Sequence, residues 1–423
     1  MNQDCDILII GAGIVGVSLV LALSHLPLRI ALIEQVPINY STDSIVTTES
    51  KPIALNYGSI RLLQSLLPGI DLLAYANPIK SVHISKQACF AAARINAKEM
   101  GVSALGYVVP AAQLGLVLTK ALLHLTKVSK LINFTIFNPA QCQALLKTRQ
   151  GWEALVTTKK GELQTVSARL VIAADGSNSI VRKLLDIGIK EQKEGQMALV
   201  TTIKLTRHHC HRAYQRFTDQ GVLAFLPLLE NKVGLVWTGG QLIKALQSLT
   251  ESDFLARLQL LFGYRLGRFL ERGASTIYPI KSFIAESQVQ PGLILLGNAA
   301  HTLSPIAAQG LNLALQDMAE LVDVLTKSFA AKKDLVDPCI GQTYLTARLD
   351  IQEQLLKFTE NLGGLFKETF GPLTLIRNSG LLAFDLVFPL KRNLSRRLMG
   401  IHGRLPPLVR GVGYQQEKEY VEI

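Results

Sequence analysis

A glycine-rich turn between two apolar segments near the N-terminus constrains the fold of this chain more than any other feature. Residues 6–10 are short and apolar, as a strand buried on both faces should be. The motif Gly11–Gly16 follows directly, and after it a helix is predicted over 15–26 and a second strand over 29–34. This order of elements predicts a βαβ unit, the building block of a doubly wound α/β fold.

The three glycines of this motif have different physical roles. Gly11 permits the tight turn, Gly13 lets the backbone approach a pyrophosphate, and Gly16 lets helix and strand pack closely. The start of the helix offers unpaired N–H groups to phosphates, and Glu34 ends the second strand, where a carboxylate can accept hydrogen bonds from ribose hydroxyls. The uncharged run 7–24 is long enough for a membrane span, but its glycines favour the dinucleotide site. Both NAD and FAD fit this motif alone.

Composition narrows the class of protein. At about 100–200 residues per domain, the 423 residues give two or three folding units. The 44 Lys and Arg against 32 Asp and Glu give a charge of +12, which favours an anionic partner such as nucleic acid, a phosphate-rich cofactor or an acidic lipid surface. The 5 scattered cysteines argue against a disulfide framework or a zinc finger and suit a reducing compartment. The acidic N-terminus lacks the basic residues of a secretory signal, so we expect a cytoplasmic protein.

Two later turns follow apolar strands and decide between the two dinucleotides. The strand predicted over 170–174 ends in the segment 175–179, which begins with Asp-Gly, and the strand predicted over 292–296 ends in the segment 297–301. A small-residue loop then leads into a helix predicted over 311–327. A loop of this kind at a helix N-terminus stabilises negative charge, which a reduced flavin carries on its N1–C2=O edge. This second anion-binding device favours FAD.

The chain as a whole resembles a known family, the flavin-dependent aromatic hydroxylases of the 4-hydroxybenzoate hydroxylase fold, and within it the ubiquinone-biosynthesis hydroxylases. The segments that carry the resemblance are spread over nearly the whole chain: 11–16, 105–109, 173–179, 213–218, 262–267 and 297–317. The sequence Gly-Asn-Ala-Ala-His-Thr-Leu at 297–303, with Asn at its second position, is most similar to the branch that acts on 2-polyprenyl-6-methoxyphenol.

The resemblance implies an α/β protein with a Rossmann-like FAD-binding domain, a β-sheet substrate domain and a C-terminal helical segment. The expected FAD-binding domain is discontinuous and comprises residues 1–75, 100–190 and 278–335. The expected substrate-binding sheet comprises residues 76–99 and 191–277, and the expected helical region comprises residues 336–423.

The resemblance also assigns cofactor contacts residue by residue. The residues that would hold the ADP half of FAD are Gly11, Gly13, Gly16 and Glu34. Those that would lie beside the pyrophosphate and the groove for a reduced nicotinamide are Asp175 and Gly176. Further expected cofactor contacts, the first of them to the ribityl chain or a phosphate, are Asn298, Ala299, Lys51 and Gln113. The residues that would face the isoalloxazine ring, where the chemistry takes place, are Pro305, Ala308, Gln309 and Gly310.

Three positions depart from the family pattern. Lys51 replaces an Arg and loses a bidentate planar donor, Pro110 replaces a Glu, and Ala308 replaces a Gly and brings a Cβ into the loop near the flavin. These departures motivate an alternative function, a non-catalytic flavoprotein that serves as an assembly or lipid-carrier component of quinone biosynthesis. The tryptophan motif of flavin halogenases is missing, because Trp152 and Trp237 lie far apart in the sequence.

The activity that the resemblance implies is hydroxylation of the aromatic ring of a polyprenylated phenol in ubiquinone biosynthesis. Reduced FAD would take up O2, form a C4a-hydroperoxide and pass one oxygen to the ring, with NAD(P)H or another electron donor as reductant. Other ubiquinone-biosynthesis proteins are expected partners. No side chain stands out as a catalytic base, and for His301 a structural hydrogen-bonding role is favoured over proton transfer.

Two basic segments carry weaker signals. The run 207–212 is rich in His and Arg, but adjacent strand residues point to opposite faces and the arginines repel a cation, so no metal site is expected. The segment 386–416 contains Lys and Arg but no acid. Two interpretations remain open for it, a solvated helix packed on the domain and an amphipathic surface that rests on anionic lipid at the periphery of the inner membrane. No motif supports nucleic-acid binding.

Overall fold

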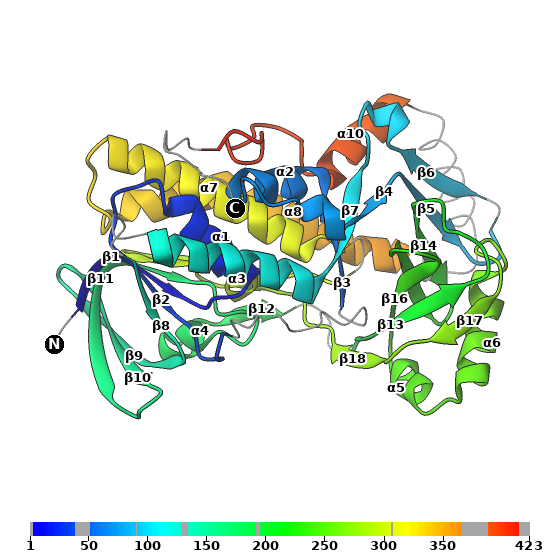
Figure 1. Cartoon of the computed structure of the whole chain (residues 1–423), viewed down its shortest axis with the longest axis horizontal. Helices are drawn as coiled ribbons and strands as arrows, with labels where there is room; N and C mark the ends of the chain where they lie inside the picture. Colours follow the sequence, from blue (N-terminus) through cyan, green and yellow to red (C-terminus); the bar gives the residue numbers. More distant parts are fainter. Residues whose placement is uncertain are drawn as a thin grey trace.

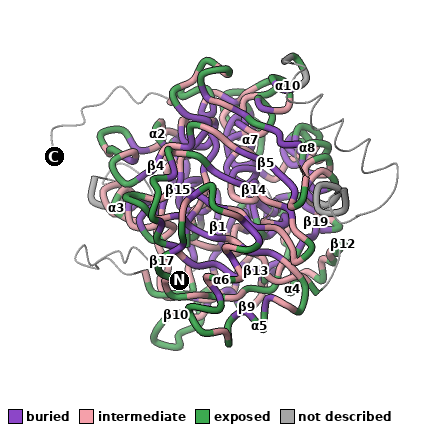
Figure 2. Tube along the Cα trace, turned by 90° about the vertical axis from the view of Figure 1, so that its right-hand side faces the viewer, coloured by how far each residue is buried: buried purple, intermediate pink, exposed green. Residues whose placement is uncertain are grey.

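Two large β-sheets lie at opposite ends of the long axis of the molecule (Figure 1). The computed structural model describes residues 3–38, 51–89, 91–128, 134–191, 195–305, 308–365 and 388–413. Seen along the long axis, buried residues fill the interior and exposed residues lie at the rim (Figure 2).

The first sheet has the strand order β20-β21-β11-β1-β2-β8, in which all strands except β20 are parallel to one another. The parallel strands are β1 (Gln3–Ile10), β2 (Ile30–Ile33), β8 (Phe134–Phe137), β11 (Leu163–Ala173) and β21 (Leu293–Leu295). Antiparallel strands extend it: β20 (Val289–Gln290), β9 (Ala140–Thr148) and β10 (Gly151–Thr158). All the parallel strands end at the same edge of the sheet, which is where ligands bind in open α/β sheets.

Strand β1 is apolar without interruption because both of its faces are covered. Ile7 and Ile9 belong to the core formed with α1 (Ile14–Leu23) and α7 (Gly310–Ala330). Leu8 belongs to the core on the opposite face, which includes side chains of β9 and β10. Helix α3 (Ala111–Val128) packs beside α1. The sequence order strand, glycine turn, helix and strand therefore gives the expected βαβ unit.

The run 7–24 is divided between a strand and a helix. The chain turns at Gly11, whose φ of +106° is a conformation that residues with a side chain rarely adopt. Helix α1 ends at Leu23, before the end predicted at residue 26, and Ser24 forms its C-cap. Within the described ranges, no helix combines the length and the apolarity needed to cross a bilayer.

The second sheet is mostly antiparallel and has the order β17-β13-β16-β15-β14-β5-β6, with β18 paired to β13. Its strands are β5 (Ser81–Lys86), β6 (Ala92–Asn96), β13 (Met197–Leu205), β14 (Arg212–Thr218), β15 (Gly221–Pro227), β16 (Lys232–Gly239), β17 (Phe269–Arg272) and β18 (Thr276–Pro279). Helices α5 (Leu242–Gln247) and α6 (Glu251–Phe262) contribute to the core on one face, which is centred on Trp237 and Phe225. The other face of this sheet contributes to a pocket.

Smaller elements connect the two large sheets. One three-stranded sheet consists of β3 (Pro52–Asn56), β7 (Gly106–Pro110) and β4 (Asn77–Ile79), and another of β12 (Ile189–Glu191), β19 (Phe283–Ala285) and β22 (His301–Thr302). The remaining helices are α2 (Tyr57–Leu66), α4 (Ile180–Leu184), α8 (Pro338–Leu365) and α10 (Phe388–Leu398), with 3-10 turns at Leu72–Tyr75, Lys98–Met100 and Gly297–Ala299.

The α/β fold class predicted from the sequence is confirmed. The domain boundaries stay a prediction. Helices α8 and α10 lie within the region 336–423 that was expected to be helical, but residues 366–387 and 414–423 of that region lie outside the described residues.

A buried ionic network attaches α8 to α7. The carboxylate of Asp317, in α7, accepts hydrogen bonds from Arg348 Nε at 2.5 Å and from Gln352 Nε2 at 3.0 Å. His301 Nε2 lies 2.5 Å from the same carboxylate. Burial by itself raises the pKa of Asp317, but the Arg348 guanidinium and the His301 ring outweigh it and hold this pKa below its ordinary value. The charged carboxylate therefore fixes two helices and the strand that carries His301.

Replacement of Asp317 by alanine is expected to lower the free energy of unfolding by about 3–5 kcal/mol, because Arg348 is then buried without its counter-charge. Denaturant unfolding followed by circular dichroism measures this loss. The control is Asp334→Ala, which removes an ion pair to Arg169 between two largely exposed side chains and should cost less than about 1 kcal/mol. Equal losses in the two variants would contradict the role of Asp317.

Candidate cofactor and substrate site

In the first glycine turn, two glycines pack tightly against backbone atoms and the third faces open space. A Cβ on Gly11 would lie 2.5 Å from the carbonyl oxygen of Ala174, and a Cβ on Gly16 would lie 1.9 Å from that of Gly11. A Cβ on Gly13 would meet no atom within 4 Å. Gly11 and Gly16 are thus required for packing, whereas Gly13 faces free space.

A cavity of about 350 Å³ joins the first glycine turn to the second. Among the residues that line it are Gly11, Gly13, Glu34, Asp175 and Gly176, all of which were expected to contact the cofactor. The structure brings these residues together although more than 130 positions of sequence separate Glu34 from Asp175, because β1 lies between β2 and β11 in the sheet.

The Glu34 carboxylate lines this cavity and also accepts hydrogen bonds from backbone N–H groups. Its Oε2 accepts a hydrogen bond from the backbone N–H of Ala12 at 2.6 Å, and its Oε1 accepts one from Val36 at 2.7 Å. An ionised carboxylate has about four acceptor sites, so capacity remains for hydroxyl groups of a ligand. Glu34 therefore fixes the glycine turn while it faces the cavity.

Asp175 caps a helix with one oxygen and leaves the other oxygen buried. Its Oδ2 accepts hydrogen bonds from the backbone N–H groups of Ile180 and Val181, at the start of α4. Its Oδ1 is buried and accepts no hydrogen bond from the described residues. A buried acceptor without a partner is costly, and a donor supplied by a ligand or a water in the cavity would satisfy it.

Arg182 joins the second glycine turn, at 175–179, to the third, at 297–301, and sequence analysis assigned it no role. Its guanidinium donates hydrogen bonds to the carbonyl oxygens of Ala299 at 2.6 Å and Ser177 at 2.5 Å, and it stacks on the ring of Phe283. Its side chain is buried, and burial lowers its pKa, which the carboxylate of Asp175 partly offsets. A position seven residues after the Asp-Gly turn was the only sequence signal, and it does not show that the guanidinium is buried.

The loop before α7 carries a backbone conformation that favours glycine. Ala308 has a φ of +51°, and its N–H donates to the carbonyl oxygen of Pro305 at 3.0 Å. Its own carbonyl oxygen accepts a hydrogen bond from Asn312 Nδ2 at 2.8 Å. A left-handed conformation costs an alanine roughly 1–2 kcal/mol, so the Gly-to-Ala departure noted in the sequence falls on a strained position. Residues 306 and 307 of this loop lie outside the described residues.

Asn312, which sequence reasoning missed, ties this loop to β3. Its Nδ2 also donates to the carbonyl oxygen of Ala54 at 2.9 Å, and its Oδ1 accepts the N–H of Asn56 at 2.8 Å. Its side chain is buried. Asn312 therefore links the loop before α7 to the small sheet around β3.

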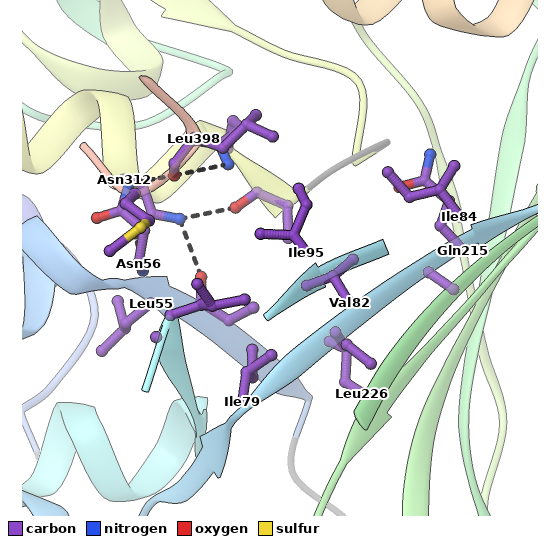
Figure 3. A pocket seen from close by; sticks show the side chains of 18 of the residues that line it. Leu55, Asn56, Ile79, Val82, Ile84, Ile95, Gln215, Leu226, Asn312 and Leu398 are labelled. Atoms are coloured by element: carbon purple, nitrogen blue, oxygen red, sulfur yellow. Dashed lines mark hydrogen bonds between the residues drawn. The ribbon is translucent and has the colours of Figure 1, made fainter. Parts of the chain in front are cut away.

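A second, mostly apolar pocket of about 160 Å³ lies next to this loop (Figure 3). Pro305, Ala308 and Gln309 line one part of it, and strands of the second sheet, the small sheet around β3 and helix α10 line other parts. No charged side chain is among its described lining residues. Three of the four residues expected to face the flavin ring thus border an apolar pocket.

The C-terminal helix α10 closes this pocket. It supplies Ser395 and Leu398 to the wall, and Met399 follows directly after it. The Leu398 carbonyl accepts a hydrogen bond from Asn56 Nδ2 at 3.2 Å, and a buried Lys391 pairs with Glu99 at 2.7 Å. Helix α10 therefore completes the pocket wall although Leu398 lies 342 residues after Asn56. No local sequence motif could indicate this contribution.

Other expected contact residues lie outside both cavities. Asn298 is exposed, Ala299 is buried in the core, and Gln113 is buried in the first turn of α3. Lys51 is exposed, with its Nζ 5.1 Å from the centre of the Tyr278 ring. Gly310 begins α7, and a Cβ on it would meet no atom within 4 Å. Their roles toward a cofactor stay predictions.

Two histidines, His301 and His209, make structural hydrogen bonds. His301 is buried on Asp317 and lines neither cavity, which agrees with the hydrogen-bonding role favoured from the sequence. In the run 207–212, Nε2 of His209 lies 2.8 Å from the carbonyl oxygen of Leu228, to which it is hydrogen-bonded.

These features define a dinucleotide-binding α/β protein with an apolar pocket beside its anion-binding loop. The chain belongs to the FAD-binding domain family, whose model matches residues 4–359. It is 31% identical to the ubiquinone hydroxylase UbiL of Rhodospirillum rubrum over 419 residues, which cover 97% of this chain and 94% of that protein. It is 29% identical to the 3-demethoxyubiquinol 3-hydroxylase of Escherichia coli over 403 residues, which cover 95% of this chain and all of that protein.

Solved structures share the fold at lower sequence identity. The p-nitrophenol 4-monooxygenase PnpA of Pseudomonas putida superposes with a TM-score of 0.74 at 14% identity, covering 96% of this chain and all of that chain. The anhydrotetracycline hydroxylase OxyS of Streptomyces rimosus has a TM-score of 0.71 at 20% identity, covering 96% of this chain and 77% of that chain.

FAD is the cofactor of this family, and the residues present fit it. Gly13 and Gly176, from the first two turns, and Gly310, at the start of α7, have no atom within 4 Å of a hypothetical Cβ, so each of these positions leaves room for a ligand. The N-terminus of α1 has no side-chain cap, which leaves its first N–H groups available for a phosphate.

Replacement of Gly13 by alanine is expected to weaken FAD binding at least about tenfold with little loss of stability, because the added methyl group enters open space where the pyrophosphate would approach. Titration of the apoprotein with FAD, followed by flavin fluorescence, measures the affinity. The matched control, Gly16→Ala, should instead lower the free energy of unfolding, because its Cβ would overlap the carbonyl oxygen of Gly11. Undiminished FAD affinity in Gly13→Ala would overturn this assignment.

Proposed function

We propose that this protein is an FAD-dependent monooxygenase that hydroxylates the aromatic ring of a polyprenylated phenol in ubiquinone biosynthesis. The observation that carries the proposal is the apolar pocket lined by Pro305, Ala308 and Gln309. These three residues belong to the loop that follows the turns expected to bind the cofactor. The names of the two relatives, a ubiquinone hydroxylase and a 3-demethoxyubiquinol 3-hydroxylase, support it.

The pocket walls suit an aromatic ring with an apolar substituent. Aliphatic side chains from β4, β5, β6 and β15 line it, among them Ile79, Val82, Ile95 and Leu226 (Figure 3). Burial of apolar ligand surface contributes about 25 cal/mol per Å². A phenol with a prenyl chain would gain affinity there, whereas a charged aromatic compound would find no counter-ion among the described lining residues.

In this proposal FAD, once reduced, supplies the activation of O2, which is chemistry that side chains lack. NAD(P)H or another donor would provide the electrons. The chain's own residues hold the ring against the loop 305–310, exclude water from the pocket and keep the loop fixed through Asn312. Gly11, Gly13, Gly16, Glu34, Asp175 and Gly176 would bind the cofactor, with Lys51, Gln113, Asn298 and Ala299 as further contacts.

The C-terminal segment supports contact with a membrane surface. In α10, Arg392, Arg396 and Arg397 are exposed, while Lys391 and Ser395 are buried, and Ser395 lines the pocket. An exposed basic face beside the pocket suits anionic lipid, from which a polyprenylated substrate would enter. We therefore favour a peripheral position on the inner membrane, and contact with other ubiquinone-biosynthesis proteins.

The direct test supplies the FAD-loaded protein with NADH or NADPH, 18O2 and 2-farnesyl-6-methoxyphenol. The expected product contains one additional oxygen atom, derived from O2, as measured by mass spectrometry. Oxidation of the reductant with hydrogen peroxide as the only oxygen product, for this and other farnesylated phenols, would contradict the proposal. Tight phenol binding with no oxidation of the reductant would favour the non-catalytic flavoprotein that the strained Ala308 suggests as the second candidate.

Replacement of Ala308 by glycine is expected to raise the free energy of unfolding by roughly 1 kcal/mol, because glycine adopts the positive φ without strain. Hydroxylation should continue, since the backbone of the loop keeps its conformation. The control is Ala300→Gly, at a φ of −87°, where the same substitution should lower stability. Thermal unfolding of both variants measures the difference, and a loss of stability in Ala308→Gly would contradict the strain argument.

A further inference from the structure

One polar side chain interrupts the apolar face that the second sheet turns toward the pocket. Strand register places Gln215 of β14 beside Ile84 of β5 and Ala224 of β15, and Ala224 beside Val236 of β16. All four residues line the pocket. Gln215 is therefore the single polar member of a row that crosses four strands.

The amide nitrogen of Gln215 is buried and has no hydrogen-bond partner among the described residues. The residue is 8% exposed. The two asparagines of the same pocket differ, because Asn56 and Asn312 bind backbone groups of neighbouring segments. A buried N–H donor without an acceptor is unfavourable, so an acceptor supplied by a ligand would relieve this cost.

Gln215 lies at the end of the pocket away from the cofactor-binding loop. In Figure 3, Gln215 and Ile84 lie on one side, Asn56 and Asn312 lie on the other, and apolar side chains lie between. Asn312 binds the carbonyl oxygen of Ala308 in the loop. A ring held against this loop would therefore direct its far edge toward Gln215.

The surroundings of Gln215 carry no charge toward the pocket. The next residue, Arg216, donates to the Leu261 carbonyl and to Ser85 Oγ, and it does not line the pocket. Burial and neighbouring arginines lower the pKa of His83 to about 4, so this ring is neutral at physiological pH, and it lies against Tyr214 outside the pocket. No cation is among the described residues that line the pocket, so the Gln215 amide suits a neutral oxygen, whereas a buried carboxylate would need a cation to offset its desolvation.

We propose that Gln215 donates a hydrogen bond to an uncharged oxygen substituent of the substrate ring, and that the pocket thereby accepts phenols without a carboxylate and rejects their carboxylated counterparts. This inference rests on the proposed function, because it requires that a prenylated phenol occupies the pocket. It assigns to Gln215 the selection of the substrate and no part in the oxygen transfer.

The test measures the affinity of the oxidised, FAD-loaded full chain for three probes by isothermal titration calorimetry. The probes are 2-farnesyl-6-methoxyphenol, farnesylbenzene, which lacks ring oxygen, and 3-farnesyl-4-hydroxybenzoate, which adds a carboxylate. The wild-type protein is expected to bind the methoxyphenol at least about tenfold more tightly than either other probe. The flavin content and melting temperature of each variant show that it is folded.

Two substitutions separate the hydrogen bond from apolar packing. Gln215→Leu is expected to weaken binding of the methoxyphenol at least about tenfold and to leave farnesylbenzene unaffected or bound more tightly. Gln215→Arg should improve binding of the hydroxybenzoate by a similar factor, because it supplies the missing cation. The matched control, Ile84→Val, removes one methylene from the same row and should weaken all three probes by a similar factor.

The outcomes distinguish this inference from the proposed function. An unchanged preference for the methoxyphenol in Gln215→Leu would overturn the role of Gln215 while the proposed function stands, as would wild-type affinity for the hydroxybenzoate equal to that for the methoxyphenol. Failure of the wild-type protein to bind any of the three probes would refute the proposed function and, with it, this inference. If Gln215→Arg does not fold, Gln215→Leu decides the question alone.

Discussion

The site depends on the close approach of two backbone turns, one of which must lack a side chain. A Cβ on Gly11 would overlap the carbonyl group of Ala174, which directly follows β11. This contact sets the Asp175 turn beside the first glycine turn, and the pairing of β11 with β21 adds the turn at Gly297. Three glycine-bearing turns from distant parts of the sequence thus meet at the carboxyl edge of one sheet, which is where open α/β sheets bind ligands.

A second close approach joins this cofactor-binding unit to the second sheet. A Cβ on Gly234 of β16 would lie 2.5 Å from Cγ of Pro52, at the start of β3. Strand β3 is in turn fixed to the loop before α7 by Asn312. The apolar pocket therefore lies where the small β3-β7-β4 sheet meets the second sheet, and its walls come from these two sheets, from the loop before α7 and from α10. An apolar ligand in this pocket would lie next to the loop that is expected to face the flavin.

The sequence predicted the fold class and part of the site because those features have local causes. A βαβ unit is formed by consecutive residues, so its pattern can be recognised in the sequence. Gly11, Glu34 and Asp175 each follow a recognisable strand. The pocket has no such signature. Arg182 and Gln215 look like ordinary polar residues of a helix and a strand, and only the packing of distant segments buries them. The positive φ of Ala308 was indicated only through the resemblance, since an alanine gives no local sign of a left-handed conformation.

The central claim is that one cofactor spans the glycine turns and ends at the apolar pocket. The most direct measurement is a crystal structure of the FAD-loaded protein. The account predicts the adenosine half along Glu34, the pyrophosphate between Gly13 and Asp175, and the isoalloxazine ring against the loop 305–310 with one edge at the mouth of the pocket. An isoalloxazine ring bound outside this loop, with the pocket separated from it by protein, would contradict the account.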